Sequence, residues 1–344
     1  MKSGLAPKLR ALAMIVCASM ACSAAFAEAQ DKQQANNDAP KISEGEQKAI
    51  EKIKSASGVA EKLKAAAEYL KKNGKSQMRP RVAAYVSDEI AKVTDHKQRI
   101  GFVETFTKTF NQAEEADLIK PTLIEALIAT NRFEDAFNEG SKHVERKPDD
   151  VIVLTMLATA GANQASIKIQ SNQAPPAGML QKASDAGSKA VELLEADKKP
   201  EQMDVAFWNN FRNTWLPRLY SAQGTILFVN KDKAAARDKL EKAVGLDPYD
   251  LSTLLMLRNI ANEEYMALAE RYQKERNQTV LNEALQKMDE LIDWLARAAA
   301  VTEGNAQQEP IYKQIMEQLN EMYAFRHDNK TDGLKELIQK YKKP

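Results

Sequence analysis

Apolar side chains recur every three or four residues from Ser43 to the carboxyl terminus, a pattern that few folds accommodate. Ile100, Val103, Phe106 and Phe110 form one such stripe. Residues with this spacing share one face of an α-helix, whereas a half-buried strand would alternate apolar and polar residues. No run of β-branched residues alternates in that way. The sequence therefore predicts an all-α chain in which helix follows helix with short connections.

Several predicted helices have capping residues at their ends. Ser43 and Glu46 have the spacing of a capping box, in which each side chain bonds to the other's backbone. Gly74 is expected to end one helix in a left-handed conformation, and Pro80 to open the next. Asp95 is expected to cap the helix that carries the stripe described above.

The amino terminus has the features of an export signal. Lys2, Lys8 and Arg10 form a positive segment, and Ala25-Phe26-Ala27 has the small-x-small pattern of a cleavage site. The apolar run between them, residues 11–21, is shorter than the ~20 residues that span a bilayer. We therefore expect residues 1–27 to be a cleaved signal peptide. The remainder is expected to be a soluble protein of the bacterial cell envelope, periplasmic or extracellular, without a transmembrane segment.

Both cysteines, Cys17 and Cys22, lie inside this predicted leader. Cleavage after Ala27 would leave a chain without disulfides, thiolate metal ligands or a cysteine nucleophile. One alternative stays open, because Ser19-Met20-Ala21-Cys22 loosely resembles a lipoprotein cleavage site that would anchor the chain through Cys22. Ser19 stands where a leucine is usual, so ordinary cleavage is favoured.

Three segments follow the leader in the predicted domain organisation. Residues 28–42 are polar and contain almost nothing to bury, so we expect a flexible linker. Residues 43–116 are predicted to form an amino-terminal helical region, and residues 117–344 a region of helical repeats.

The charge of the chain gives no reason to expect a nucleic-acid partner. There are 49 Lys and Arg against 48 Asp and Glu, a formal net charge of +1. Loss of Lys2, Lys8 and Arg10 with the leader would leave 46 against 48, or −2. Phosphate binding needs a surplus of basic residues on one face.

Two stretches of 34 residues, 117–150 and 217–250, carry the strongest local signal. In the second, Gly224 lies in a first helix at a point where two helices must approach closely. Ala236, Leu240 and Ala243 then share one face of a second helix. Pro248 stops that helix and starts the following one.

These residues resemble the tetratricopeptide repeat, with Gly, Ala, a large apolar residue, Ala and Pro at the family's spacing. The stretch 117–150 matches less fully: Ile124 replaces the small residue of the first helix, Gly140 the large apolar residue of the second, and His143 its last Ala. The resemblance implies antiparallel helix pairs stacked into a right-handed α-solenoid with a concave groove. Because most repeats are degenerate, this solenoid is expected to be irregular.

The flanking units depart further from the repeat length. Gly161 and Ala183 are expected in the first and second helices of one unit, with an inserted loop at 171–176 between them. Another unit has a first helix that continues to about Lys274, and a last helix pair is predicted at 311–326 and 333–341.

No residue pattern indicates catalysis, a metal site or a cofactor. His96, His143 and His327 are far apart without HxxxH or HExxH spacing, so they are interpreted as solvent-facing or helix-end residues. Adjacent carboxylates such as Glu263-Glu264 point in different directions on a helix and are normally solvated. A helical hydrolase would need two carboxylates about 5–10 Å apart in a deep pocket. We therefore predict a protein that is not an enzyme and has no cofactor.

An aromatic segment is the most distinctive local feature. Phe207, Phe211 and Trp215 recur every four residues and are expected to form a core stripe. Trp208 falls off that stripe and is the aromatic residue expected to be exposed, as an anchor for a peptide or a sugar. This segment supports the alternative function, a carbohydrate- or small-ligand-binding helical repeat protein.

The favoured function is an adaptor or scaffold that binds a protein or peptide partner. Tetratricopeptide proteins usually hold extended peptides along the concave groove lined by their first helices, and the resemblance assigns residues to that face. They are Arg218, Ser221, Thr225 and Phe228 in the best-matching repeat, and Glu125, Asn259 and Asn262 in neighbouring units. Too few Lys, Arg and Asn residues converge there for the carboxylate clamp of the family, so the partner's identity is left open.

Overall fold

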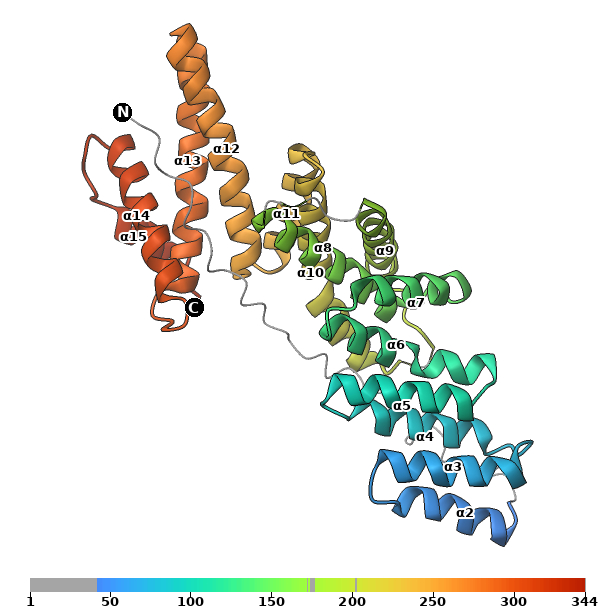
Figure 1. The fold of residues 1–344 in the computed structure, drawn as a ribbon. Coiled ribbons are helices and arrows are strands. Elements are labelled where there is room, and N and C mark those ends of the chain that lie inside the picture. Colours follow the sequence, from blue (N-terminus) through green and yellow to red (C-terminus); the bar gives the residue numbers. More distant parts are fainter. Residues whose placement is uncertain (1–41, 172, 174–176, 202, 344) are drawn as a thin grey trace. The chain divides into compact units, whose positions relative to one another are not determined.

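The computed structural model describes residues 42–171, 173, 177–201 and 203–343, and every regular element among them is an α-helix (Figure 1). The predicted all-α fold of helical hairpins is confirmed. The helices are α2 (Glu44–Ser55), α3 (Val59–Asn73), α4 (Arg79–Ala91), α5 (His96–Thr109), α6 (Ala113–Ala129), α7 (Phe133–Arg146), α8 (Val151–Gln170), α9 (Ala177–Glu195), α10 (Val205–Val229), α11 (Lys233–Leu246), α12 (Leu251–Glu275), α13 (Gln278–Thr302), α14 (Glu309–Arg326) and α15 (Leu334–Lys340).

The helices form two compact units. Unit 1 ends at Trp215 and unit 2 begins at Leu216, so α10 contributes its first part to one unit and its last part to the other. Pro217 lies inside α10, which continues through it.

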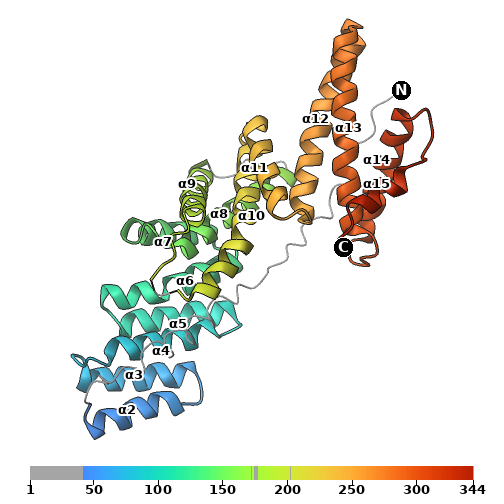
Figure 2. The same ribbon diagram turned by 180° about the vertical axis from the view of Figure 1, so that it is seen from behind.

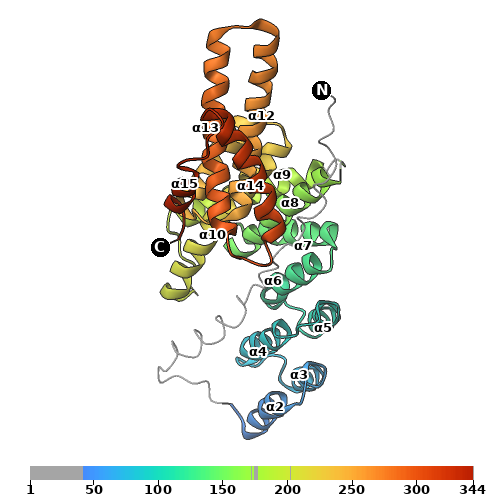
Figure 3. The same ribbon diagram turned by 90° about the vertical axis from the view of Figure 1, so that its left-hand side faces the viewer.

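In unit 1, consecutive helices pair as hairpins: α2 with α3, α4 with α5, α6 with α7 and α8 with α9. The first helices α4, α6 and α8 also adjoin one another, as do the second helices α3 and α5. Figure 3 shows the two rows, with α2, α4 and α6 on one side and α3, α5 and α7 on the other. Gly161 and Ala183 lie in the two helices of one hairpin, as predicted, and α8 and α9 approach closely there: a Cβ added to Gly161 would lie 2.2 Å from Ala183 Cβ.

Two helix starts follow the predicted capping residues. Ser43 Oγ accepts a hydrogen bond from the amide of Glu46 (3.1 Å), and Asp95 Oδ1 accepts one from the amide of Lys97 (2.9 Å). Pro80 lies in the first turn of α4. The polar side chains thus satisfy backbone donors that a helix leaves unpaired at its start.

Two capping predictions were wrong. The box at Ser43 is not completed, because the Glu46 carboxylate instead accepts hydrogen bonds from Tyr69 Oη (2.7 Å) and Ser76 Oγ. These bonds tie α2 to α3 and the turn after it. Gly74 has a right-handed backbone (φ −61°), so its left-handed cap does not form.

The hairpins at 117–150 and 217–250 have equivalent backbone hydrogen bonds, 100 residues apart. Each turn has a left-handed residue, Asn131 (φ 59°) in one and Lys231 (φ 64°) in the other. The amide of the next residue bonds to the carbonyl of Leu127 or Leu227, at 2.8 and 3.0 Å. The two stretches therefore fold as the same hairpin, in the predicted register. Their membership of the tetratricopeptide family stays a prediction.

The two hairpins pack differently around their glycines. A Cβ on Gly224 would lie 2.5 Å from Leu240 Cγ, so the predicted contact of first and second helix is confirmed. Gly140 stands at the position equivalent to Leu240. The space beside Gly140 is filled by Leu157 of the following hairpin, whose Cδ2 would lie 2.7 Å from an added Cβ.

Unit 2 is built around the hairpin of α12 and α13, each 25 residues long. Leu257, Leu291 and Leu319 are among its fully buried core residues, and α14 and α15 pack against α13. The far ends of α12 and α13 extend beyond α14 and α15 (Figures 2 and 3). The predicted ends of α12, α14 and α15 agree within one residue with the observed ends at Glu275, Arg326 and Lys340.

Several predictions fall outside the described residues. They concern the leader at 1–27 with Cys17 and Cys22, all but the last residue of the linker at 28–42, and most of the insertion at 171–176. The predicted boundary at 116/117 falls inside α6, and that domain division stays a prediction. None of the helices in the described part has both the length and the apolar character needed to cross a bilayer.

Candidate functional site

A cavity of about 870 Å³ lies across the first helices of unit 1. We call this cavity the first-helix groove. One face of α4 and one face of α6 line it, and the lining residues on each helix are spaced by one, three or four positions. They are Ala84, Ser87, Asp88 and Ala91 from α4, and Glu114, Asp117, Leu118, Pro121, Thr122 and Glu125 from α6.

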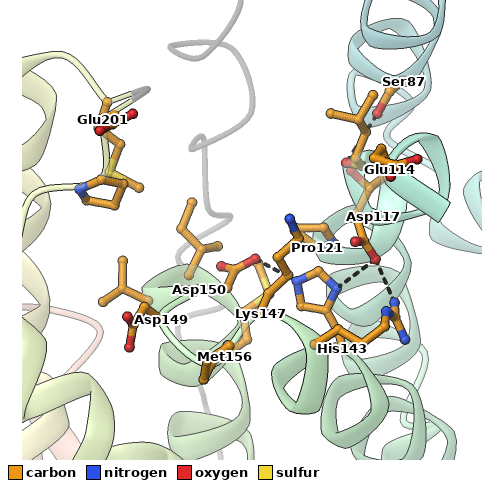
Figure 4. A pocket seen from close by; sticks show the side chains of 18 of the residues that line it. Ser87, Glu114, Asp117, Pro121, His143, Lys147, Asp149, Asp150, Met156 and Glu201 are labelled. Atoms are coloured by element: carbon orange, nitrogen blue, oxygen red, sulfur yellow. Dashed lines mark hydrogen bonds and ion pairs between the residues drawn. The ribbon is translucent and has the colours of Figure 1, made fainter. Parts of the chain in front are cut away.

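The end of α7, its turn to α8, the start of α8, one residue of α9 and the segment between α9 and α10 complete the wall. The lining residues here are His143, Arg146, Lys147, Pro148, Asp149, Asp150, Val151, Ile152, Met156, Leu193, Lys198, Lys199, Pro200, Glu201 and Met203. In Figure 4, Asp117 and Asp150 point toward His143 from either side. Segments more than one hundred residues apart in sequence, from Ala84 to Met203, thus meet around one space.

A buried ion pair fixes the spacing of α4 and α6. Arg79 Nε donates to Glu115 Oε1 (2.5 Å), and Arg79 Nη2 donates to Glu115 Oε2 (2.8 Å). The Glu115 side chain is only 3% exposed and also accepts the amide of Gln112 (3.1 Å) at the start of α6. Because a bidentate pair has one geometry, it orients the starts of both helices that line the groove.

His143 is held between two carboxylates in the groove wall. It is 1% exposed, and its Nε2 lies 2.7 Å from Asp150 Oδ2. Its Nδ1 lies 3.7 Å from Asp117 Oδ1 and has no hydrogen-bond partner among the described residues. The carboxylate of Asp150 also accepts the amide of Val153 (3.1 Å), so the residue that caps α8 fixes the imidazole.

Acidic residues outnumber basic ones in the lining, and the basic ones are largely engaged. Asp88, Glu114, Asp117, Glu125, Asp149, Asp150 and Glu201 face Arg146, Lys147, Lys198 and Lys199, seven against four. Arg146 Nη2 binds Asp117 Oδ1 (2.6 Å), and Lys199 Nζ donates to the carbonyls of Pro200 (3.0 Å) and Met203 (2.7 Å). Within the described part of the chain, no hydrogen bond or ion pair engages the carboxylates of Asp88 and Glu114.

Burial raises the pKa of two of these carboxyls. The pKa of Asp88 is raised to about 6, mainly by burial and further by Glu89, while Lys92 opposes the shift. Burial likewise raises the pKa of Glu125, against the opposing charges of Arg99 and His96. Glu125 is compensated by a charge-assisted bond from Arg99 Nη1 (2.9 Å), whereas no described residue donates such a bond to Asp88. A perturbed carboxyl in a cavity is a usual sign of a functional site.

Leu118 supplies an exposed apolar surface in the groove. It is 44% exposed and lies on the same face of α6 as the acidic residues Glu114 and Asp117. Pro121, Ile152 and Met156 extend the apolar part of the lining. The groove therefore combines apolar contact with charge, as peptide-binding surfaces do.

The predicted binding residues are only partly brought together. Glu125 lines the first-helix groove in unit 1. In unit 2, Ser221 Oγ accepts a hydrogen bond from Thr253 Oγ1 (2.8 Å), and Thr225 is buried. Phe228 packs against the unit 2 core, Arg218 is exposed, and Asn262 Oδ1 accepts from Gln318 Nε2 (3.2 Å), while Asn259 is half-buried on α12.

The expectation that Trp208 is exposed was wrong. Its side chain is 2% exposed, and its Nε1 donates to Asp197 Oδ1 (2.6 Å). The indole stacks on Phe211, with ring centroids 6.3 Å apart, whereas Phe207 and Trp215 on the predicted core stripe are only half-buried. The aromatic segment is thus part of the unit 1 core and offers no exposed tryptophan.

The sequence did not indicate Asp88, Leu118 or the burial of His143. One signal was available for Leu118: it is equivalent to Arg218, as Pro121 is to Ser221 and Glu125 to Thr225, in hairpins that align residue for residue. The helix face that was predicted to bind a partner in the hairpin 217–250 therefore lines the groove in the hairpin 117–150. Asp88 lies in a region without any repeat match, where no such signal exists.

No group of three or more His, Cys, Asp and Glu side chains in the described residues could hold a metal ion. The chain matches no protein-family model, and no curated protein matches its sequence.

Proposed function

We propose that this chain is an exported adaptor of the cell envelope, related to tetratricopeptide proteins, that holds an extended peptide segment of a partner protein in the first-helix groove. The observation that carries this proposal is the cavity of about 870 Å³ across α4, α6 and α8. A space of this size exceeds what a single side chain fills and lies in the range of ligand-binding clefts. The proposed export rests on the leader sequence alone.

The alternative of carbohydrate binding loses its main support. That function relied on Trp208 as an exposed stacking surface, and this residue is buried in the unit 1 core. A solvent-exposed aromatic face is what sugar rings pack against, and no tryptophan of the described residues lines the groove.

Hydrolysis is the less favoured use of the groove. It would need an acid with a raised pKa facing a second carboxylate that is free to act. Asp88 has a raised pKa, but Glu125 is bound by Arg99, Asp117 and Asp150 hold Arg146 and His143, and Glu114 is exposed to solvent. Because the other carboxylates serve structural contacts or are solvated, we propose binding without catalysis.

Affinity capture with matched variants tests the proposal. The exported full chain is immobilised and exposed to an envelope extract, and retained proteins are quantified by mass spectrometry. Leu118→Gln removes an apolar contact in the groove and should weaken capture at least ~10-fold, since burial of one leucine contributes ~1.5–3 kcal/mol. Leu246→Gln is the control, because Leu246 is 53% exposed on α11 outside the groove.

Equal capture by the wild type and the Leu118→Gln variant would contradict the proposal. Arg218→Glu tests the face that the sequence predicted in unit 2. Loss of capture in that variant alone would move the binding surface to α10 and also overturn the proposed groove.

A further inference from the structure

We propose that the first-helix groove selects a cationic peptide, and that a Lys or Arg side chain of this peptide forms an ion pair with Asp88. This inference rests on the proposed function and names the chemical class of its ligand. Three features of the groove support it: an unpaired carboxylate, a surplus of acidic lining and a buried ring nitrogen without a hydrogen-bond partner.

Asp88 is placed to receive a cation. It is half-buried on α4, between the small side chains of Ala84 and Ala91 on the same face. No hydrogen bond or ion pair of the described residues engages its carboxylate. Lys92, the residue that follows α4, bonds to Glu89 (2.6 Å), although its charge also acts on Asp88. A carboxylate that is partly withdrawn from water without a partner gains most from an incoming positive charge.

The surrounding charges favour a cation over an anion. Of the four basic side chains in the lining, Arg146 is bound by Asp117 and Lys199 by backbone carbonyls, and Lys198 lies 3.7 Å from Glu192. Glu114 and Glu201 are exposed and extend the acidic surface along the groove. A peptide with several positive charges would therefore meet complementary potential, and an acidic peptide would be repelled.

His143 supplies an independent sign of a ligand that donates hydrogen bonds. An ionised Asp150 can only accept, so the 2.7 Å contact assigns the imidazole hydrogen to Nε2. The other ring nitrogen, Nδ1, is buried 3.7 Å from Asp117 Oδ1 and has no hydrogen-bond partner among the described residues. Buried polar atoms are nearly always paired, and lysine, arginine and peptide amides all carry an N–H that Nδ1 of a neutral ring accepts.

The apolar lining indicates a peptide rather than a small cation. Leu118, Pro121 and Met156 give the groove surfaces that an ammonium or metal ion would not use. Extended peptides place alternate side chains on opposite sides. Alternation of cationic and apolar residues would therefore fit carboxylates and Leu118 at the same time.

Three labelled decapeptides test this proposal by fluorescence anisotropy. They share alternating leucine positions and blocked ends, and their other positions are all Lys, all Gln or all Glu. At about 0.15 M salt, where long-range charge effects are screened, the full chain should bind the Lys peptide at least ~10-fold more tightly than the Gln peptide. The Glu peptide should bind most weakly.

Asp88→Asn tests the assigned carboxylate. This variant should weaken the Lys peptide about 5- to 10-fold and leave the Gln peptide unchanged, whereas Asp88→Glu should restore the preference. Glu104→Gln removes the same charge from an exposed position on α5 outside the groove and should change neither affinity. Circular dichroism confirms that each variant is folded.

The possible failures separate this inference from the proposed function. Equal affinity for the Lys and Gln peptides, no binding of the Lys peptide at 1 mM, or equal effects of Asp88→Asn and Glu104→Gln would each overturn the inference. If Leu118→Gln still abolishes partner capture in that case, the groove binds a partner of other chemistry and the proposed function stands. If Leu118→Gln has no effect on capture, the proposed function itself fails.

Discussion

The hairpins at 117–150 and 217–250 have the same backbone, but the outward face of the first helix is open in one and covered in the other. In the second, the first helix is tied to the next first helix by a hydrogen bond between Thr253 and Ser221 (2.8 Å), and Thr225 is buried. In the first, the equivalent positions Pro121 and Glu125 line an open groove. The better match to the repeat pattern is therefore not the better candidate for binding.

This difference shows which structural property the residues of the repeat pattern indicate. Gly224, Ala236 and Leu240 describe how two helices of one hairpin pack, and their contacts are internal. The outward face of the first helix depends on other positions, which the repeat pattern leaves free. A hairpin can thus lose the pattern, as at Gly140 and His143, while its backbone stays the same.

The largest effect is expected from restoring the large apolar residue of the pattern at Gly140. Gly140→Leu should destabilise unit 1 by about 3 kcal/mol, because Leu157 already fills that space. Hydrogen exchange of α7 and α8 peptides measures the loss, and α13 peptides report whether unit 2 is affected. Gly101→Ala, at an open position within α5, should instead stabilise by about 0.5–1 kcal/mol. A stable Gly140→Leu variant would show that the two hairpins pack alike.

A smaller loss is expected when His143 is given the alanine of its counterpart Ala243. His143→Ala should cost about 2 kcal/mol of unfolding free energy, because it removes a buried imidazole and its bond to Asp150. Urea unfolding measures this value, with Lys142→Ala on the exposed face of α7 as a control expected within about 0.5 kcal/mol. A His143→Ala variant as stable as the wild type would mean that the backbone alone determines which side chain fits at this position.

The smallest effect, with the opposite sign, is expected at Asp88. Its pKa rises from 3.8 to about 6 on folding, so the folded state binds the proton more tightly and stability falls as pH rises between these values. Asp88→Asn removes this loss and should stabilise by about 1 kcal/mol at pH 7.5, after allowance for solvent screening. The difference from wild type should disappear below about pH 4.

Urea unfolding of both proteins across this pH range measures the change at Asp88. Glu104→Gln serves as the control, with an expected effect below about 0.5 kcal/mol. Destabilisation by Asp88→Asn at pH 7.5 would mean that the carboxylate has a partner within the fold. A stabilised variant that binds the Lys peptide less well would identify Asp88 as a residue kept for binding at a cost in stability.

The helices and their register were predictable from the sequence because both depend on local spacing. Asp95 caps its helix, and the turn at Asn131 falls where the 34-residue period requires. Glu125 was assigned to the correct face for the same reason. These predictions needed only neighbours within one hairpin.

The groove was not predictable in the same way. Asp88 belongs to a helix without a repeat match, and its significance depends on α6 and on the segment before α10. Trp208 is buried through Asp197, a left-handed residue (φ 52°) in the preceding turn that no pattern marks. Burial of both side chains is decided by contacts between elements, which periodicity does not encode.

The long hairpin of α12 and α13 has a mechanical consequence. Arg326 of α14 binds Asp289 (2.7 Å), and Lys287 of α13 binds Glu264 of α12 (2.8 Å). Nearer the turn, Arg271 pairs with Glu275 on its own helix (2.9 Å). From Asp289 to the turn at Asn277 is 12 residues, or roughly 18 Å of helix. The hairpin is thus held at its base and projects beyond it by about twice the ~10 Å separation of packed helices. A small force applied at the turn is therefore increased by leverage at the base, where α14 packs.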